Sequence, residues 1–120
     1  MTDAPDSLFV TRLKGRELVA VTFVQDYLQL KFDPDPAGLS CYTKVSIRRG
    51  GESATFGKPG FADRLLACIG HYVDVAVHDT DRALELHFDN GSVFSAPLAL
   101  GDYVGPEALQ LNSRGDIIIE

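Results

Sequence analysis

Apolar and polar residues alternate along two stretches of the chain that resemble each other, residues 15–33 and 70–89. Both stretches begin with glycine, run into β-branched residues, turn, and finish on apolar-x-apolar-x-Phe-Asp. A period of two is typical of strands that bury one face. Each stretch is therefore predicted to form a β-hairpin, and the similarity between them indicates an internal duplication.

In the second stretch the pattern predicts a buried face shared by two strands. Residues 79–82 are polar and supply the turn between them. The register that follows points three facing pairs inward: Val77 with Leu84, Val75 with Leu86, and Val73 with Phe88.

The first stretch leaves its register open. Its apolar residues can face one another only if Asp26 and Tyr27 form the turn or if the strand carries a bulge. The residues concerned are Val19, Val21 and Phe23 on one strand and Leu28, Leu30 and Phe32 on the other.

Each hairpin is predicted to gain a third strand. Residues 38–49 follow the first, and residues 92–98 follow the second after Asn90-Gly91, a strong signal for a tight turn. A last strand is expected at residues 117–119, three isoleucines that could be buried on both faces or lie against a partner.

A segment that contains glycine, proline and an aromatic residue follows each meander. The first, residues 56–61, leads into a short helix over residues 61–69, with Phe61, Leu65 and Ile69 on one face. The second, residues 103–107, leads to a single helical turn at residues 107–111.

Together these elements predict one domain over residues 1–120, mainly β (α+β), with one short crossover helix. Two duplicated three-stranded antiparallel meanders would form a sandwich or a half-closed barrel of about seven strands. The internal duplication covers about residues 15–61 and 70–109. It predicts a pseudo-twofold axis with the Gly/Pro segments at related places. Residues 1–7 are expected to be flexible.

Composition narrows the class of protein. Hydrophobic residues make up 45% and charged residues 23% of the chain, as in soluble globular proteins. No apolar run approaches the roughly 18 residues of a membrane span, and the first residues lack the pattern of a secretory signal, so a cytoplasmic protein is expected. Cys41 and Cys68 have no neighbouring cysteine, and we predict buried free thiols rather than a disulfide or redox pair.

Charge is negative overall and uneven along the chain. The net charge of −6 argues against nucleic acid as a partner. Residues 65–120 hold nine acids and two bases, a formal sum of −7, whereas residues 44–64 sum to +3. An acidic surface speeds encounter with a basic partner, but outward strand positions also need charge for solubility and edge protection. Both interpretations stay open.

No residue spacing typical of catalysis or of a cofactor is present. The chain has neither a G-x-S-x-G nucleophile motif nor a glycine-rich phosphate loop. Of the three histidines, the predicted register places His87 opposite Asp74, but two ligands are too few for a metal, and a surface ion pair is expected. We therefore predict no metal and no cofactor, and the sequence favours a noncatalytic role.

The segment of residues 101–108 is the first candidate for a binding site. Its two glycines and one proline define an irregular path that would hold Asp102, Tyr103 and Glu107 in a defined arrangement. Tyr42 is a further candidate contact for a small ligand at an open end of the sheets. The alternative is structural, with the Tyr103 ring buried over the end of the sheet.

The pattern G-x-x-L-x-x-V-x-F-x-x-D-Y-L-Q-L-x-F-D of residues 15–33, with D-Y-V-G-P-E-A at residues 102–108, resembles an uncharacterised family of small bacterial β-rich proteins. Some of these are similar to immunity-type proteins encoded beside toxin genes. The resemblance implies a toxin-neutralising role and carries over no catalytic residue.

Two functions are therefore expected as alternatives. The first is a noncatalytic protein-interaction module whose acidic second half meets another, basic protein. The second is a small-ligand-binding β domain that uses an open end of the sheets. A homodimer formed by residues 116–120 pairing across a twofold axis is a further hypothesis.

Overall fold

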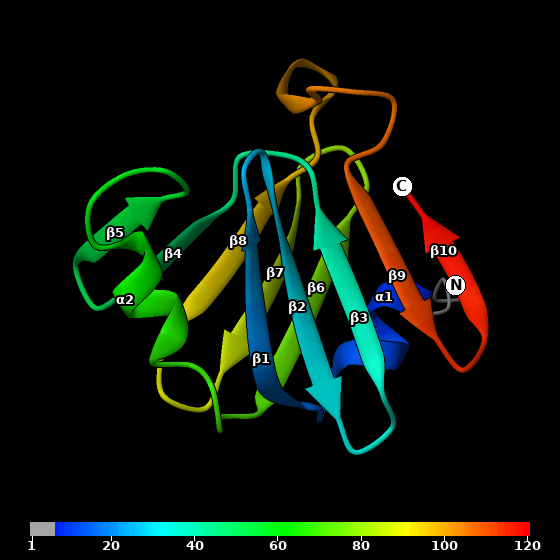
Figure 1. Cartoon of the computed structure of the whole chain (residues 1–120), viewed down its shortest axis with the longest axis horizontal. Coiled ribbons are helices and arrows are strands. Elements are labelled where there is room, and N and C mark those ends of the chain that lie inside the picture. Colours follow the sequence, from blue (N-terminus) through cyan, green and yellow to red (C-terminus); the bar gives the residue numbers. More distant parts are fainter. Residues whose placement is uncertain (1–6) are drawn as a thin grey trace, which may run out of the picture.

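The structure, a computed structural model that describes residues 7–120, consists of two five-stranded antiparallel sheets that face each other (Figure 1). The first sheet has the strand order β1-β2-β3-β9-β10 and the second the order β5-β4-β8-β7-β6. The predicted mainly β sandwich is confirmed, with ten strands where about seven were expected. The strands are β1 Glu17–Val24, β2 Tyr27–Asp33, β3 Ala37–Cys41, β4 Ser46–Arg49, β5 Glu52–Thr55, β6 Val73–Asp79, β7 Ala83–Phe88, β8 Val93–Pro97, β9 Leu109–Ser113 and β10 Asp116–Ile119.

Each half of the chain contributes a meander to one sheet and a hairpin to the other. Strands β1 to β3 form the first meander, after which the β4–β5 hairpin crosses over and pairs with β8. Strands β6 to β8 form the second meander, after which the β9–β10 hairpin crosses back and pairs with β3. Neither sheet can therefore form from one half alone.

The halves meet in backbone hydrogen bonds that occur in matched pairs. The amide of Gly15 donates to the carbonyl of Val73 and that of Gly70 to Leu18, both at 2.8 Å. The amides of Val73 and Leu18 in turn donate to Arg16 and His71, at 2.9 and 3.0 Å. Gly15 corresponds to Gly70 in the duplication, and Leu18 corresponds to Val73. Each hydrogen bond from the first half to the second therefore has a counterpart from the second half to the first, as a pseudo-twofold axis requires.

A short helix precedes each set of five strands, α1 (Leu8–Leu13) and α2 (Phe61–Leu66). Each carries Phe-x-x-Arg-Leu, and its phenylalanine and leucine are buried in the core. Arg12 of α1 pairs with Asp116 at 3.1 Å, and Arg64 of α2 pairs with Glu52 at 2.9 Å. Because those acids begin β10 and β5, each helix is tied to the outermost strand of a sheet. Helix α2 is the predicted crossover helix.

Two expectations about the helices need correction. Helix α2 ends at Leu66, and Ile69 lies exposed beyond it instead of on the buried face. Helix α1 was not predicted, and Ser7, expected to be flexible, caps it by accepting a hydrogen bond from the amide of Val10 at 3.3 Å. The same expectation for residues 1–6 lies outside the described residues.

The predicted register of the second hairpin is wrong at two of its three pairs. A bulge at Asp74 shifts β6 by one residue, so that Ala76 pairs with Leu86 and Val77 with Glu85. Val73, Leu84, Leu86 and Phe88 are buried as expected, but Val75 and Val77 are 47% and 44% exposed. A bulge reverses the faces of every residue beyond it, and alternation in the sequence alone cannot reveal it.

The first hairpin contains a bulge at the related position, between Leu18 and Ala20. This was one of the two alternatives left open, and the other is wrong because Tyr27 belongs to β2 and pairs with Val24. Val21 and Phe23 face Leu30 and Leu28, as the bulge requires.

Two further predicted elements differ in the structure. The expected strand over residues 38–49 is two strands in different sheets, β3 and β4, which are joined by residues 42–45. The expected helical turn at residues 107–111 is the start of β9. The Gly/Pro segments are also not related by the duplication, since one joins β5 to α2 and the other joins β8 to β9.

Cys41 and Cys68 are free and buried, as predicted. Burial raises the pKa of both thiols above the ordinary value, so the reactive thiolate is scarce at any pH below that raised pKa. We expect neither thiol to react with Ellman's reagent in the native protein at mildly alkaline pH, and both to react in concentrated guanidinium chloride. Rapid labelling of the native protein would contradict the buried positions.

Candidate functional site

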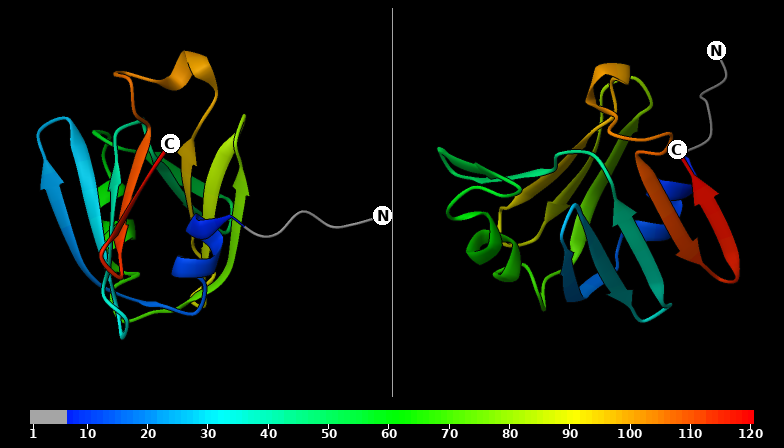
Figure 2. Two further views of the ribbon diagram at one scale, coloured as in Figure 1. Left: turned by 90° about the vertical axis from the view of Figure 1, so that its right-hand side faces the viewer. Right: turned by 45° about the horizontal axis from the view of Figure 1, so that its top comes forward.

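Strand register brings four connections and the end of β10 to one end of the molecule, uppermost in Figure 1. The connections are the β1–β2 turn, the β3–β4 link, the β6–β7 turn and residues 98–108. Residues 98–108 stand over the two sheets (Figure 2). We call this surface the acidic end, because it holds six carboxylates and two basic side chains. The carboxylates are Asp26, Asp79, Asp81, Asp102, Glu107 and Glu120, and the bases are Lys44 and Arg82.

A groove of about 410 Å³ opens at the acidic end between the β1–β2 turn, the β3–β4 link and the loop before β9. Its walls include two of the predicted residues, Tyr42 and Glu107. The amide of Tyr42 donates to the carbonyl of Ala108 at 2.8 Å, so the link and the loop are joined beside the groove. The full lining is Asp26, Tyr27, Tyr42, Val104, Gly105, Pro106 and Glu107.

Two tyrosines form the aromatic part of this groove. Leu28 and Cys41 pair across β2 and β3 with their side chains buried, so Tyr27 and Tyr42 beside them lie on the outer face. Their ring centroids are 5.2 Å apart and their planes are inclined by 45°. Asp26 and Glu107 also line the groove, and no lysine or arginine among residues 7–120 does. Aromatic faces and carboxylates together suit a cationic group.

The structure places the other two predicted residues at the acidic end but outside the groove. Asp102 accepts a hydrogen bond from the amide of Ala99 at 3.2 Å and closes the 3-10 turn η1 (Leu100–Asp102). Tyr103 is half-buried against the core. Desolvation and the nearby carboxylates of Glu120 and Asp81 raise the pKa of Tyr103. The Gly/Pro segment therefore directs its first acid and its tyrosine into structural contacts and Glu107 into the groove.

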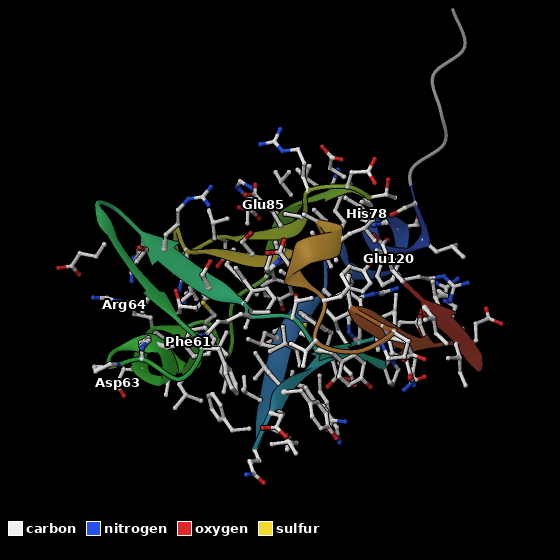
Figure 3. All side chains as sticks on the ribbon, turned by 90° about the horizontal axis from the view of Figure 1, so that it is seen from above. Phe61, Asp63, Arg64, His78, Glu85 and Glu120 are labelled. Carbon is white, nitrogen blue, oxygen red and sulfur yellow. The ribbon has the colours of Figure 1, made fainter. Side chains whose placement is uncertain are left out.

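A second polar feature of this end joins the sheets. His78 of β6 pairs through Nε2 with Oε1 of Glu120, and the two side chains, 5% and 16% exposed, point toward each other (Figure 3). Phe9 of α1 meets the His78 ring edge-on at 5.0 Å. The carbonyl of Glu120 accepts from the amide of Leu109 at 3.0 Å. The His78–Glu120 pair therefore closes the side of the sandwich between β6 and β10.

The predicted Asp74–His87 pair does not form. Asp74 occupies the bulge, so His87 stands opposite Val75 and instead contacts Glu85 at 3.2 Å. The exposed Asp-His pair is His71 with Asp89, at 2.6 Å. Within residues 7–120 no group of three or more metal-ligating side chains lies close enough to hold an ion.

Sequence reasoning missed Asp26 and Tyr27 as site residues. The dipeptide was considered only as one possible hairpin turn, and its place beside Tyr42 follows only from the pairing of β2 with β3. The helices described in residues 7–120 are all too short to cross a membrane. Comparisons with protein-family models, curated proteins and solved structures found no significant match. The function is therefore argued from the chemistry of the acidic end.

Proposed function

We propose that this chain is a noncatalytic protein-interaction module that binds a basic protein at its acidic end. The observation that carries the proposal is the groove, which two tyrosines and two acidic residues, Asp26 and Glu107, line without a lysine or arginine from residues 7–120. A groove of this kind leaves negative charge available to a partner instead of neutralising it within the chain. Electrostatic complementarity of this type speeds association and selects against acidic partners.

Apolar side chains beside the groove support a protein as the partner. Leu100 and Val104 lie on the loop over this end and are 89% and 85% exposed. Exposed apolar side chains surrounded by charge are typical of interaction sites. The resemblance to immunity-type proteins fits this picture, with a basic toxin as the partner. The proposal places the interaction in the cytoplasm, where thiols such as Cys41 and Cys68 stay reduced.

Neutralising three acids of the acidic end, two of them in the groove, is expected to abolish most of the binding. The triple variant Asp26→Asn, Asp81→Asn, Glu107→Gln removes charge where the partner is proposed to dock, and affinity should fall about tenfold or more at low salt. Immobilised protein would capture partners from a lysate of the native host at about 50 mM and about 500 mM salt, and the captured protein would be identified by mass spectrometry.

The matched control removes the same charge elsewhere. Asp33, Asp63 and Asp74 are exposed, lie away from the acidic end, and have no ion pair among residues 7–120. Changing all three to asparagine should leave capture nearly intact. Equal loss in both variants, or capture that high salt does not weaken, would overturn the proposal.

The volume of the groove favours one second candidate, a small-ligand-binding domain. About 410 Å³ lies within the range of small-molecule sites. A thermal-shift screen against metabolites separates the two, since a small ligand in the groove would raise the melting temperature and lose that effect in Tyr42→Leu. A module that binds only protein should give no hit.

A further inference from the structure

We infer that the groove receives one arginine side chain of the partner, with the guanidinium lying against Tyr27 and Tyr42 and hydrogen-bonded to Asp26 and Glu107. This inference rests on the proposed function and names the chemistry of its contact. Three features of the structure support it: the placement of the two tyrosines, the charge of the lining, and the surface around the groove.

The tyrosines provide a platform for a planar cation. Tyr27 begins β2 and Tyr42 directly follows β3, the adjacent antiparallel strand, and the two lie side by side on the outer face of the first sheet, with ring centroids 5.2 Å apart. An aromatic face attracts a cation within about 6 Å of its centroid through the ring quadrupole. A group held over one ring is therefore also close to the other.

The carboxylates select the kind of cation. Asp26 lies in the β1–β2 turn and Glu107 in the loop before β9, so they enter the groove from different segments. Neither carboxylate has an ion pair among residues 7–120. A guanidinium has five donors in one plane, so it can bond to two carboxylates while it stacks on a ring, whereas an ammonium is a compact, strongly hydrated point charge. The lining therefore favours arginine over lysine.

The surroundings favour an arginine within a polypeptide over a free small cation. Exposed Leu100 and Val104 lie on the loop above the groove, and Asp79 and Asp81 carry further charge at the same end. A small cation in the groove would reach Val104, which lines it, but would leave Leu100 and the outer carboxylates unused. A polypeptide that inserts one arginine can place apolar neighbours on the leucine and valine and basic neighbours near the outer carboxylates.

The test is an NMR titration of the ¹⁵N-labelled full chain with capped pentapeptides that differ only at the central residue of a glycine background. The residues are arginine, lysine and citrulline, which keeps the planar group of arginine without its charge. The arginine peptide should shift the amides around Tyr27, Tyr42 and Glu107 and bind about threefold or more tighter than the lysine peptide. The citrulline peptide should cause no shift.

Three results would overturn the inference: equal binding of citrulline, equal or tighter binding of tetramethylammonium, and shifts confined to the β6–β7 turn. The last would mean that the acidic end attracts cations without a specific groove.

Variants separate the aromatic contribution from the charge. Tyr42→Leu should weaken the arginine peptide by roughly threefold to tenfold, and Tyr42→Phe should bind like the wild type because the ring is kept. Tyr27→Leu gives a second measurement if Tyr42→Leu does not fold. Glu107→Gln should weaken binding about threefold, whereas Asp81→Asn, the same loss of charge outside the groove, should change it little. Equal effects of the last two variants would overturn the inference.

Failure of the inference is distinguishable from failure of the proposed function. If no peptide binds but host capture is still lost in the triple acidic-end variant, the acidic end binds a protein without an arginine in the groove. If capture is also unaffected by that variant, both are wrong.

Discussion

Ala76→Asp is expected to lower the free energy of unfolding by about 3–5 kcal/mol, because it places a carboxylate in the core without a partner. Ala76 is buried and pairs with Leu86, whose side chain is also buried. Its neighbour Val75 lies on the opposite face of β6, so Val75→Asp should cost about 1 kcal/mol or less. Urea denaturation followed by circular dichroism measures both values.

The two variants test the bulge directly. Simple alternation from Val73 predicts the reverse order, with Val75 buried and Ala76 exposed. A large loss for Val75→Asp together with a small loss for Ala76→Asp would show that β6 runs without the bulge at Asp74, and that the packing of the second sheet described here is wrong.

Glu120→Ala is expected to cost about 2–4 kcal/mol, because it leaves the imidazole of His78 without its partner in a largely buried place. The comparison is Asp89→Asn, which breaks the His71–Asp89 pair. Those side chains are 42% and 38% exposed, so water replaces the lost contact and the cost should stay within about 1 kcal/mol. Denaturant unfolding at constant pH measures the difference.

An apolar replacement of the whole pair gives an independent check. The duplication relates His78 to Phe23, which meets Phe61 of α2 edge-on at 6.4 Å, as His78 meets Phe9 of α1. The double variant His78→Phe, Glu120→Leu should therefore regain most of the stability lost in Glu120→Ala. If it is less stable than Glu120→Ala, the pair does more than close the side of the sandwich.

Local patterns identified the regularly alternating strands and were less informative where a strand is bulged, short or preceded by an irregular loop, as the inner strand β9 is. Leu84, Leu86 and Phe88 alternate with polar residues in β7, which has a hydrogen-bonded neighbour on each side, and the pattern is regular for that reason. β6 lies at a sheet edge, where a bulge disturbs fewer hydrogen bonds, and its pattern misled the interpretation. β5 is a four-residue edge strand with little apolar content, and it was missed.

The sequence predicted two of the four polar and aromatic residues of the candidate site, Tyr42 and Glu107. Glycine and proline around Glu107 marked a defined loop, and Tyr42 was expected as a contact at an open end of the sheets. Nothing local distinguishes Asp26 and Tyr27 from the residues of any other hairpin turn. They reach the groove because β2 pairs with β3 and because residues 98–108 stand over the same end.

By itself the sequence determined the hairpins β1–β2 and β6–β7, the turn of the second of them and the mainly β class, because alternation and turn chemistry act between residues close along the chain. Tertiary structure alone decided that the last hairpin of each half pairs in the other sheet, and that a bulge turns Val75 and Val77 outward. It also decided that two tyrosines and two acidic residues line one groove. These outcomes depend on pairing between residues distant in sequence. Several registers and partners satisfy the same local pattern, and only the packing of the complete core selects among them.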